Sequence, residues 1–332
     1  MLTLITLVLL VILILGHEWG HFIAAKLLGI RVDEFGVGFP PKLYSKKWGE
    51  TEYSLNLLPF GGFVRIHGED ELKKEISDPK RSFFTQPFWK KAVVISSGVL
   101  MNFIIGWIAF SAVLMMGIPA GIQIQGITPM SPAEEAGFVV GEVITGFDSA
   151  EAFSQFINEN KGETIVLNDK EIIPRVDVPA GEGPLGISFV FNETVSSNFW
   201  ESIIVGFKSA LNTLWAIFAA LGGFLWGILT GNFSVLEEVS GPVGVFVVVK
   251  EATQLGAVYL IQLLGLISLN LAVLNTIPFP ALDGGRFLFT LLQRLFGKKV
   301  FNKKLELVVN VIGFLFLISL MIMVTIKDII SL

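Results

Sequence analysis

The sequence predicts a polytopic α-helical membrane protein with four transmembrane helices, a membrane-associated β-hairpin region and one extracytoplasmic α+β domain. Composition is the first observation behind this fold class: of 332 residues, 52% are hydrophobic and 16% are charged, whereas soluble proteins carry about 25% charged residues. The second observation is a mean hydropathy of +0.69. The third is that long apolar runs alternate with loops of unequal basic content, which orients the spans.

Four apolar runs are long enough to cross a bilayer, which takes about 20 residues. They cover residues 2–28, 92–118, 257–279 and 305–326. No cysteine is present, which excludes disulfides and cysteine-ligated metals. The formal net charge of -5 gives no basic surface for nucleic acid.

Basic residues decide the orientation of these spans, because Lys and Arg gather in cytoplasmic loops. Residues 29–91 and 284–304 are rich in both, whereas residues 119–199 carry only Lys161, Lys170 and Arg175. The two basic loops therefore belong in the cytoplasm, and the segment between them lies on the outer side. An arrangement of four spans puts all three loops on their expected sides and places both termini outside.

A fifth apolar run, residues 203–229, contains Lys208, Ser209 and Asn212 together with several aromatic residues. A span here would move the second basic loop to the outer side, against the distribution of Lys and Arg. We therefore expect this run to lie in the membrane interface.

Ionisable residues interrupt the first apolar run. His17 and His21 are four residues apart, so they share one face of a helix and could hold one metal ion. Glu18 follows His17 and could reach a water molecule on that metal. Ionisable residues in a membrane are unfavourable unless a site needs them. The alternative is a polar patch hydrogen-bonded to neighbouring helices.

A zinc site needs a third protein ligand. Glu34 follows in the same region, but the chain leaves the membrane before reaching it. Asp283 is the better candidate, because prolines break the apolar run before it and glycines follow it. Membrane proteins tolerate such breaks where the backbone is buried in protein or lines a wet cavity. The alternative is an ordinary turn or capping aspartate at the cytoplasmic edge.

These motifs resemble the bacterial site-2 proteases of the regulator-of-sigma-E type. The likeness rests on His17-Glu18-x-x-His21 and on Asn275-x-x-Pro-Phe-Pro-Ala-Leu-Asp283-Gly. Three further stretches are similar to family segments: residues 35–70 to its hairpin region, 96–106 to its second-helix motif and 240–245 to its Ser-Gly-Pro-Val-Gly stretch. In the second-helix motif, Val99 stands where the family often has proline.

The alternating pattern in residues 35–66 predicts a β-hairpin with Trp48-Gly49 at its centre. Its open edge could pair with an extended substrate segment. The alternative is a hairpin that only packs against the helices. His67 follows in a polar stretch, and we expect it to be a solvated loop residue rather than a metal ligand.

Residues 126–149 are similar to the core of a PDZ domain, although Glu142 stands where aspartate is usual. Residues 183–189 could form the loop and strand that receive a peptide by β-strand addition. The segment has room for one such domain, whereas many relatives carry two. The alternative is a small β-rich domain without a ligand.

The resemblance divides the chain into four parts. These are residues 1–118 with the first two transmembrane helices and the hairpin region, 119–192 with the PDZ-like domain, 193–256 with an interfacial amphipathic region, and 257–332 with the last two transmembrane helices and the Asp-Gly motif.

The resemblance implies an intramembrane zinc metalloprotease. Zn²⁺ would be held by His17, His21 and Asp283, and Glu18 would be the general base. Asn275 and Asn102 could bind the substrate backbone or the developing oxyanion, or could equally join helices.

The implied substrates are single-pass membrane proteins trimmed beforehand on their outer side, such as an anti-sigma factor or a remnant signal peptide. The implied location is the bacterial cytoplasmic (inner) membrane, with the PDZ-like domain and both termini on the extracytoplasmic side. The lipid bilayer is the other partner, and no nucleic acid is expected. Two alternatives stay open: a zinc protease acting on misfolded or loop substrates at the membrane surface, and a non-enzymatic membrane scaffold with a PDZ-like module.

Overall fold

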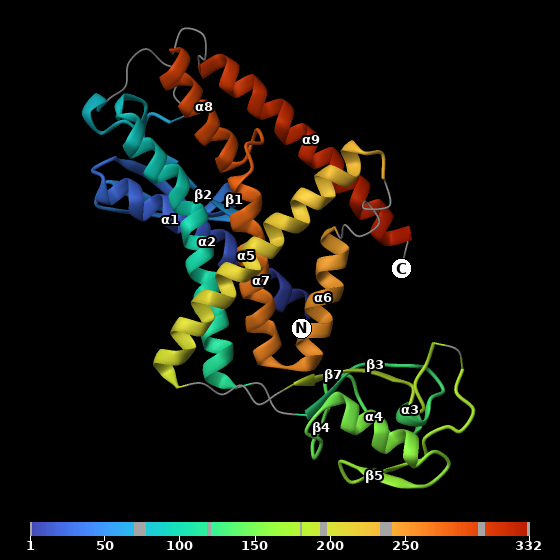
Figure 1. The fold of residues 1–332 in the computed structure, drawn as a ribbon. Coiled ribbons are helices and arrows are strands. Elements are labelled where there is room, and N and C mark those ends of the chain that lie inside the picture. The colour runs from blue at the N-terminus through green and yellow to red at the C-terminus, as the bar shows by residue number, and fades with distance from the viewer. Residues whose placement is uncertain are drawn as a thin grey trace. The chain divides into compact units, whose positions relative to one another are not determined.

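The computed structural model describes residues 2–69, 78–117, 121–179, 181–192, 198–232, 241–297 and 303–330. These residues are mainly helical and include three small antiparallel sheets (Figure 1). The chain forms two compact units. The first comprises Met1–Ile108, Lys208–Val249 and Leu264–Leu332, and the second comprises Ala109–Phe207 and Lys250–Leu263.

Five of the described helices are long and apolar enough to cross a membrane. They are α1 (Leu2–Leu27), α2 (Phe88–Met116), α5 (Phe199–Leu229), α7 (Ala257–Thr276) and α9 (Lys303–Ile330). Four of them correspond to the four predicted spans. The fifth, α5, has 31 residues and contains the run expected to be interfacial. Its length and hydropathy suit a span, and its interfacial placement stays a prediction. The chain is a multi-pass membrane protein.

The β-hairpin follows α1 directly. Strand β1 (Val32–Trp48) pairs antiparallel with β2 (Thr51–Ile66), and Gly49 takes a left-handed φ of 63° in the turn. The hairpin prediction is therefore confirmed, with strands that begin slightly earlier than expected. Its base is apolar, because Ile30, Val32 and Ile66 pack with residues of α1 and α2 in one buried cluster.

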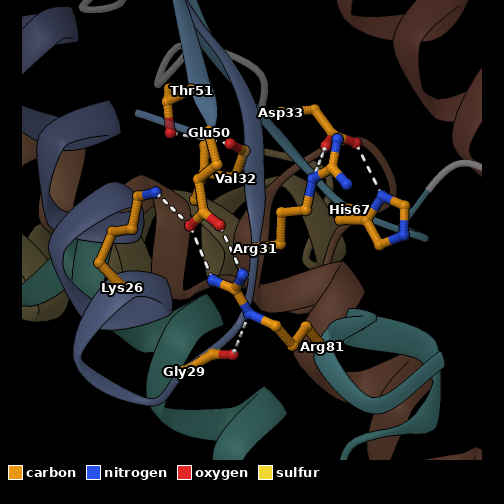
Figure 2. A network of polar contacts seen from close by, with 9 residues as sticks. All are labelled: Lys26, Gly29, Arg31, Val32, Asp33, Glu50, Thr51, His67 and Arg81. Atoms are coloured by element: carbon orange, nitrogen blue, oxygen red, sulfur yellow. Dashed lines mark hydrogen bonds and ion pairs between the residues drawn. The ribbon is translucent and has the colours of Figure 1, made fainter. Parts of the chain in front are cut away.

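Two short 3-10 helices, η1 (Pro79–Arg81) and η2 (Phe83–Thr85), precede α2 and fold against the hairpin. Figure 2 shows Glu50, from the hairpin turn, held by Lys26 at the end of α1 and by Arg81. The Arg81 and Lys26 side chains lower the pKa of Glu50 to about 2. These ion pairs fasten the hairpin turn to the end of the first helix.

The expectation that His67 is solvated is wrong. Its side chain is buried, and Nδ1 lies 2.9 Å from Asp33 Oδ2 (Figure 2). The reason is that the two 3-10 helices lie against this part of the hairpin, where the Phe83 amide donates to the His67 carbonyl. Polar neighbours in the sequence concealed this burial.

The second unit contains an α+β domain. Strands β3 (Gly121–Ile127), β4 (Val143–Ile144) and β7 (Ile187–Asn192) form a sheet of order β4-β3-β7. Helices α3 (Pro132–Glu135) and α4 (Ala150–Glu159) and a hairpin of β5 (Ile165–Leu167) and β6 (Lys170–Ile172) complete it. The core contains Ile122, Ile124, Phe153 and Ile157. The PDZ-like assignment and the four-part division stay predictions.

The Ser-Gly-Pro-Val-Gly stretch begins at Ser240, which lies outside the described residues, and continues into α6 (Pro242–Leu255). Asp328 from α9 accepts hydrogen bonds from the amides of Gly241 at 2.8 Å and Gly244 at 3.0 Å. A carboxylate at this position satisfies amides that the first turn of a helix leaves without a partner. The stretch is therefore a docking point between α6 and α9.

Candidate metal centre

Helix α1 presents His17 and His21 on one face toward α2. Their rings meet edge to face, with centroids 4.8 Å apart. Gly98 of α2 lies opposite both rings, and a Cβ atom there would come within 2.6 Å of His17 Cε1 and 2.7 Å of His21 Cε1. Glycine is therefore the residue that lets α2 approach the two histidines.

Asp283 reaches the histidines because the chain bends sharply between α7 and α8 (Asp283–Phe296). Gly284 and Gly285 let the first turn of α8 lie against backbone carbonyls of the bend, where any Cβ would collide. The side chain of Asn310 in α9 accepts a hydrogen bond from the Ala281 amide at 3.2 Å. Ala281 itself has a φ of 73°, which only a bend fixed by its surroundings sustains.

The three candidate ligands converge. Asp283 Oδ2 lies 3.0 Å from His17 Nε2 and 3.1 Å from His21 Nε2, and the two Nε2 atoms are 3.2 Å apart. A tetrahedral zinc ion with bonds of about 2.0–2.1 Å separates its ligand atoms by about 3.3 Å. The three atoms therefore form a triangle of nearly the size that zinc requires.

The hydrogen bonding around these atoms also fits a cation. His21 Nδ1 lies 2.8 Å from the Val94 carbonyl oxygen, which can only accept, so Nδ1 carries a proton; in the neutral ring, the form that binds a metal, Nε2 then directs its lone pair toward Asp283. Asp283 Oδ2 is buried and has no partner in hydrogen-bond geometry among the described residues, despite the short approaches of both rings. A shared cation accounts for lone pairs that face one another at this distance.

Glu18 lies beside this triangle. It is partly buried and close enough to His17, His21 and Asp283 for their charges to interact. On its other side runs β2, where a Cβ on Gly62 would be 3.8 Å from Glu18 Cγ. The Glu18 side chain is thus close both to the candidate ligands and to a strand of the hairpin.

The other predicted residues have different surroundings. Asn102 is fully buried and contacts His17 Nδ1 at 3.1 Å, which does not suit direct contact with a substrate. Asn275 is partly exposed in the last turn of α7. Glu34 is buried in β1 and paired with Lys42 and Arg65, so the geometry leaves it no part in this site.

Two neighbours of the site were missed by sequence reasoning. Gly98 follows two serines in α2, and small residues in a membrane helix are a signal of close helix packing. Arg286, one turn after Asp283 on α8, contacts Glu69 and places Nη1 3.9 Å from Asp283 Oδ1. No spacing rule connects Arg286 with Glu69, because the contact joins distant segments of the chain.

Comparison with known proteins gives a consistent result. The family model for peptidase family M50 matches residues 5–320. A protein of Clostridium perfringens named as a zinc metalloprotease is 35% identical over 330 residues, covering 96% of this chain and 95% of the relative. One of Clostridium acetobutylicum, named in the same way, is 33% identical over 328 residues, with coverage of 96% and 94%.

The zinc metalloprotease RasP of Oceanobacillus iheyensis is also similar, at 27% identity over 420 residues, with 96% of each chain covered. This alignment is longer than the 332 residues present here, so that relative has segments without a counterpart in this chain. Membership in a peptidase family argues against the non-enzymatic scaffold. The chain belongs to peptidase family M50, the site-2 protease family, and is a membrane-embedded zinc metalloendopeptidase.

Proposed function

We propose that the protein cleaves the transmembrane segments of single-pass membrane proteins after these have been trimmed on their outer side. The observation that carries this proposal is the convergence of two imidazole nitrogens and a carboxylate oxygen, each within 3.2 Å of the others, beside Glu18 on a helix apolar enough to span the membrane. The proposed zinc ligands are His17, His21 and Asp283.

Glu18 would act as the general base. Zinc, when bound, supplies a Lewis acid that polarises the scissile carbonyl and lowers the pKa of a water molecule toward neutrality. Glu18 takes a proton as the water oxygen adds to the carbonyl carbon, and passes it to the amide nitrogen as the C–N bond breaks. The products are a carboxylate and an amine.

A transmembrane substrate must first unwind, because the carbonyls of a helix are engaged in its own hydrogen bonds. The hairpin supports a way to do this. Residues 34–37 of β1 pair on one side with residues 52–55 and on the other side with residues 62–65 of β2, and among the described residues no further strand pairs with 62–65. Strand β2 passes Glu18 at Gly62, within this outer segment. An unwound segment paired with this edge would lie extended beside the base. Asn275 remains the candidate to bind its backbone.

The PDZ-like domain would receive a peptide end on the extracytoplasmic side. A cavity of about 140 Å³ lies between α4 and β7, lined by Phe153, Ile157, Leu185 and Phe189 among others. Among the described strands, β7 is at the edge of its sheet, which suits β-strand addition. An anti-sigma factor or a remnant signal peptide, each left with a new end by an earlier cleavage, fits this requirement. We place the protein in the bacterial cytoplasmic membrane, with both termini outside.

The proposal is tested with the purified full chain and Glu18→Gln in detergent. Each is assayed for bound zinc and incubated with single-span substrates, both whole and with the outer part removed. We expect about one zinc in each protein, cleavage within the span by the native chain alone, and preference for the trimmed substrates. Cleavage by Glu18→Gln at the native rate, or cleavage restricted to loops outside the span, would contradict the proposal.

A further inference from the structure

The second ring nitrogen of His17 meets a side chain from α2. Asn102 is fully buried, and its amide nitrogen lies 3.1 Å from His17 Nδ1. Its amide oxygen is also buried and has no hydrogen-bond partner among the described residues. A buried acceptor without a partner costs about 1–3 kcal/mol, so a donor for this oxygen would be stabilising.

His21 shows how the neighbouring ring is held. Its Nδ1–H donates to the carbonyl of Val94, which lies in α2 as Asn102 does, and in the neutral ring this leaves Nε2 unprotonated. Val94, Gly98 and Asn102 follow one another at intervals of four residues, so they form one stripe of α2 opposite the histidine pair of α1. Val94 lies against His21, Asn102 lies against His17, and Gly98 leaves room for both rings.

We propose that Asn102 is a positioning residue: its side-chain oxygen accepts the Nδ1–H of His17 and keeps Nε2 of that ring free for zinc. The inference rests on the zinc site proposed above. The nitrogen and oxygen of an amide have nearly the same shape, so a half-turn of the amide exchanges them without moving any other atom. The oxygen then gains the partner it lacks and the nitrogen takes its former place, so the tautomer that His17 needs decides between the two orientations.

The opposite orientation would work against the site. If the amide nitrogen donates to His17 Nδ1, the proton of the neutral ring must be on Nε2, where it points at Asp283 and His21 and occupies the ligand position. Only the orientation with oxygen toward the ring gives both histidines the same tautomer. The Asn102 side-chain oxygen thereby accepts the Nδ1–H of His17, as the Val94 carbonyl accepts the Nδ1–H of His21.

The backbone of Asn102 is fixed as well. Ser268 of α7, also fully buried, donates to the Asn102 carbonyl at 2.8 Å. This hydrogen bond connects α2 with the helix that leads to the Asp283 bend. Asn102 is therefore behind His17, on the side away from Asp283, where it can orient the ring without contacting a substrate.

Two variants separate the oxygen from the nitrogen. Asn102→Asp keeps an acceptor and removes the donor, whereas Asn102→Leu has a similar size and neither group. Zinc affinity of the purified full chain is measured by competition with a chromophoric chelator. We expect Asn102→Asp to stay within about threefold of the native chain and Asn102→Leu to bind about 10–100-fold more weakly, the range found for lost partners of metal ligands. Asn270→Leu, at an exposed amide on α7, is the matched control and should bind as the native chain does.

Equal weakening in Asn102→Asp and Asn102→Leu would identify the nitrogen as the working atom and overturn the inference, as would native affinity in Asn102→Leu. The native protein provides an independent measurement. The chain has three histidines, so ¹⁵N-histidine labelling gives three rings whose tautomers NMR can distinguish. In the zinc-loaded protein we expect Nδ1–H on both His17 and His21, and a proton on Nε2 of His17 would overturn the inference.

Failure of the proposed zinc site gives a different result. If His17→Ala retains native zinc affinity, the site itself is wrong. If His17→Ala loses zinc while Asn102→Leu retains it, the proposed zinc site is supported and the proposed role of Asn102 is wrong.

Discussion

Replacing Gly98 by alanine would place a methyl group against both histidine rings. An ideal Cβ at this position lies 2.6 Å from His17 Cε1 and 2.7 Å from His21 Cε1, well inside the usual carbon–carbon separation of about 3.5–4.0 Å. The backbone of α2 cannot retreat freely, because Val94 and Asn102 on either side hold the same rings. The rings must therefore turn or separate.

The energetic consequence falls mainly on the zinc-bound state. Without metal the rings can rotate away from the new methyl group, whereas the proposed zinc site requires both Nε2 atoms and Asp283 Oδ2 at their present spacing. Overpacking a close contact costs about 1–3 kcal/mol, and each 1.4 kcal/mol is about tenfold in affinity. We expect Gly98→Ala to weaken zinc binding by about 5–150-fold.

The assay is a chelator competition titration on the purified chain, together with thermal unfolding of the zinc-free protein. Gly222→Ala is the matched control, because Gly222 also lies within a helix and a Cβ there would meet nothing within 4 Å. Native zinc affinity in Gly98→Ala, or an equal loss in Gly222→Ala, would refute the reasoning that α2 shapes the site through this glycine.

Three further predictions follow from the same structure. Asp283→Ala removes the carboxylate that both histidine rings face, and we expect bound zinc to fall below about a tenth of the native content by elemental analysis. An unchanged zinc content would exclude Asp283 as a ligand. Glu50→Gln breaks the pairs with Lys26 and Arg81 and should destabilise the chain by about 1–2 kcal/mol at pH 7 after allowance for screening. The pKa of Glu50 in the folded chain is lowered from 4.5 to about 2. The difference in stability between the variant and the native chain should therefore be complete above pH 4.5 and shrink as the pH falls toward 2. A stability difference that calorimetry finds independent of pH would contradict the ion-pair explanation. Asp328→Ala leaves two amides at the start of α6 without their acceptor. Hydrogen exchange of these amides should accelerate about tenfold. Unchanged exchange would show that the Asp328 carboxylate does not stabilise the start of this helix.

Local patterns were sufficient for the parts of the molecule that depend on neighbouring residues. The spacing of His17 and His21 places both on one helical face whatever surrounds them. The alternation around Gly49 likewise produces the hairpin, because the turn brings complementary strands together. Both features could be predicted from a few residues.

Features that depend on distant segments were harder to predict. His67 follows the hairpin in a polar stretch, yet it is buried because the 3-10 helices fold over it. Asn102 was expected either to bind the substrate or to join helices, and only the packing of α2 against α1 reveals that it faces His17. The convergence of Asp283 with the histidines requires the bend that Gly284, Gly285 and Asn310 maintain, which no local periodicity encodes.

The central claim is that zinc is held by two histidines of α1 and one aspartate of α8. Zinc K-edge X-ray absorption of the purified full chain tests it most directly, because the scattering from imidazole rings is distinctive and gives the number of histidine ligands. The account predicts two imidazoles and oxygen ligands at about 2.0–2.1 Å, with the imidazole count reduced to one in His17→Ala. Three imidazoles would bring in His67, which lies with Asp33 near the hairpin base, and would contradict the account, as would a single imidazole in the native protein.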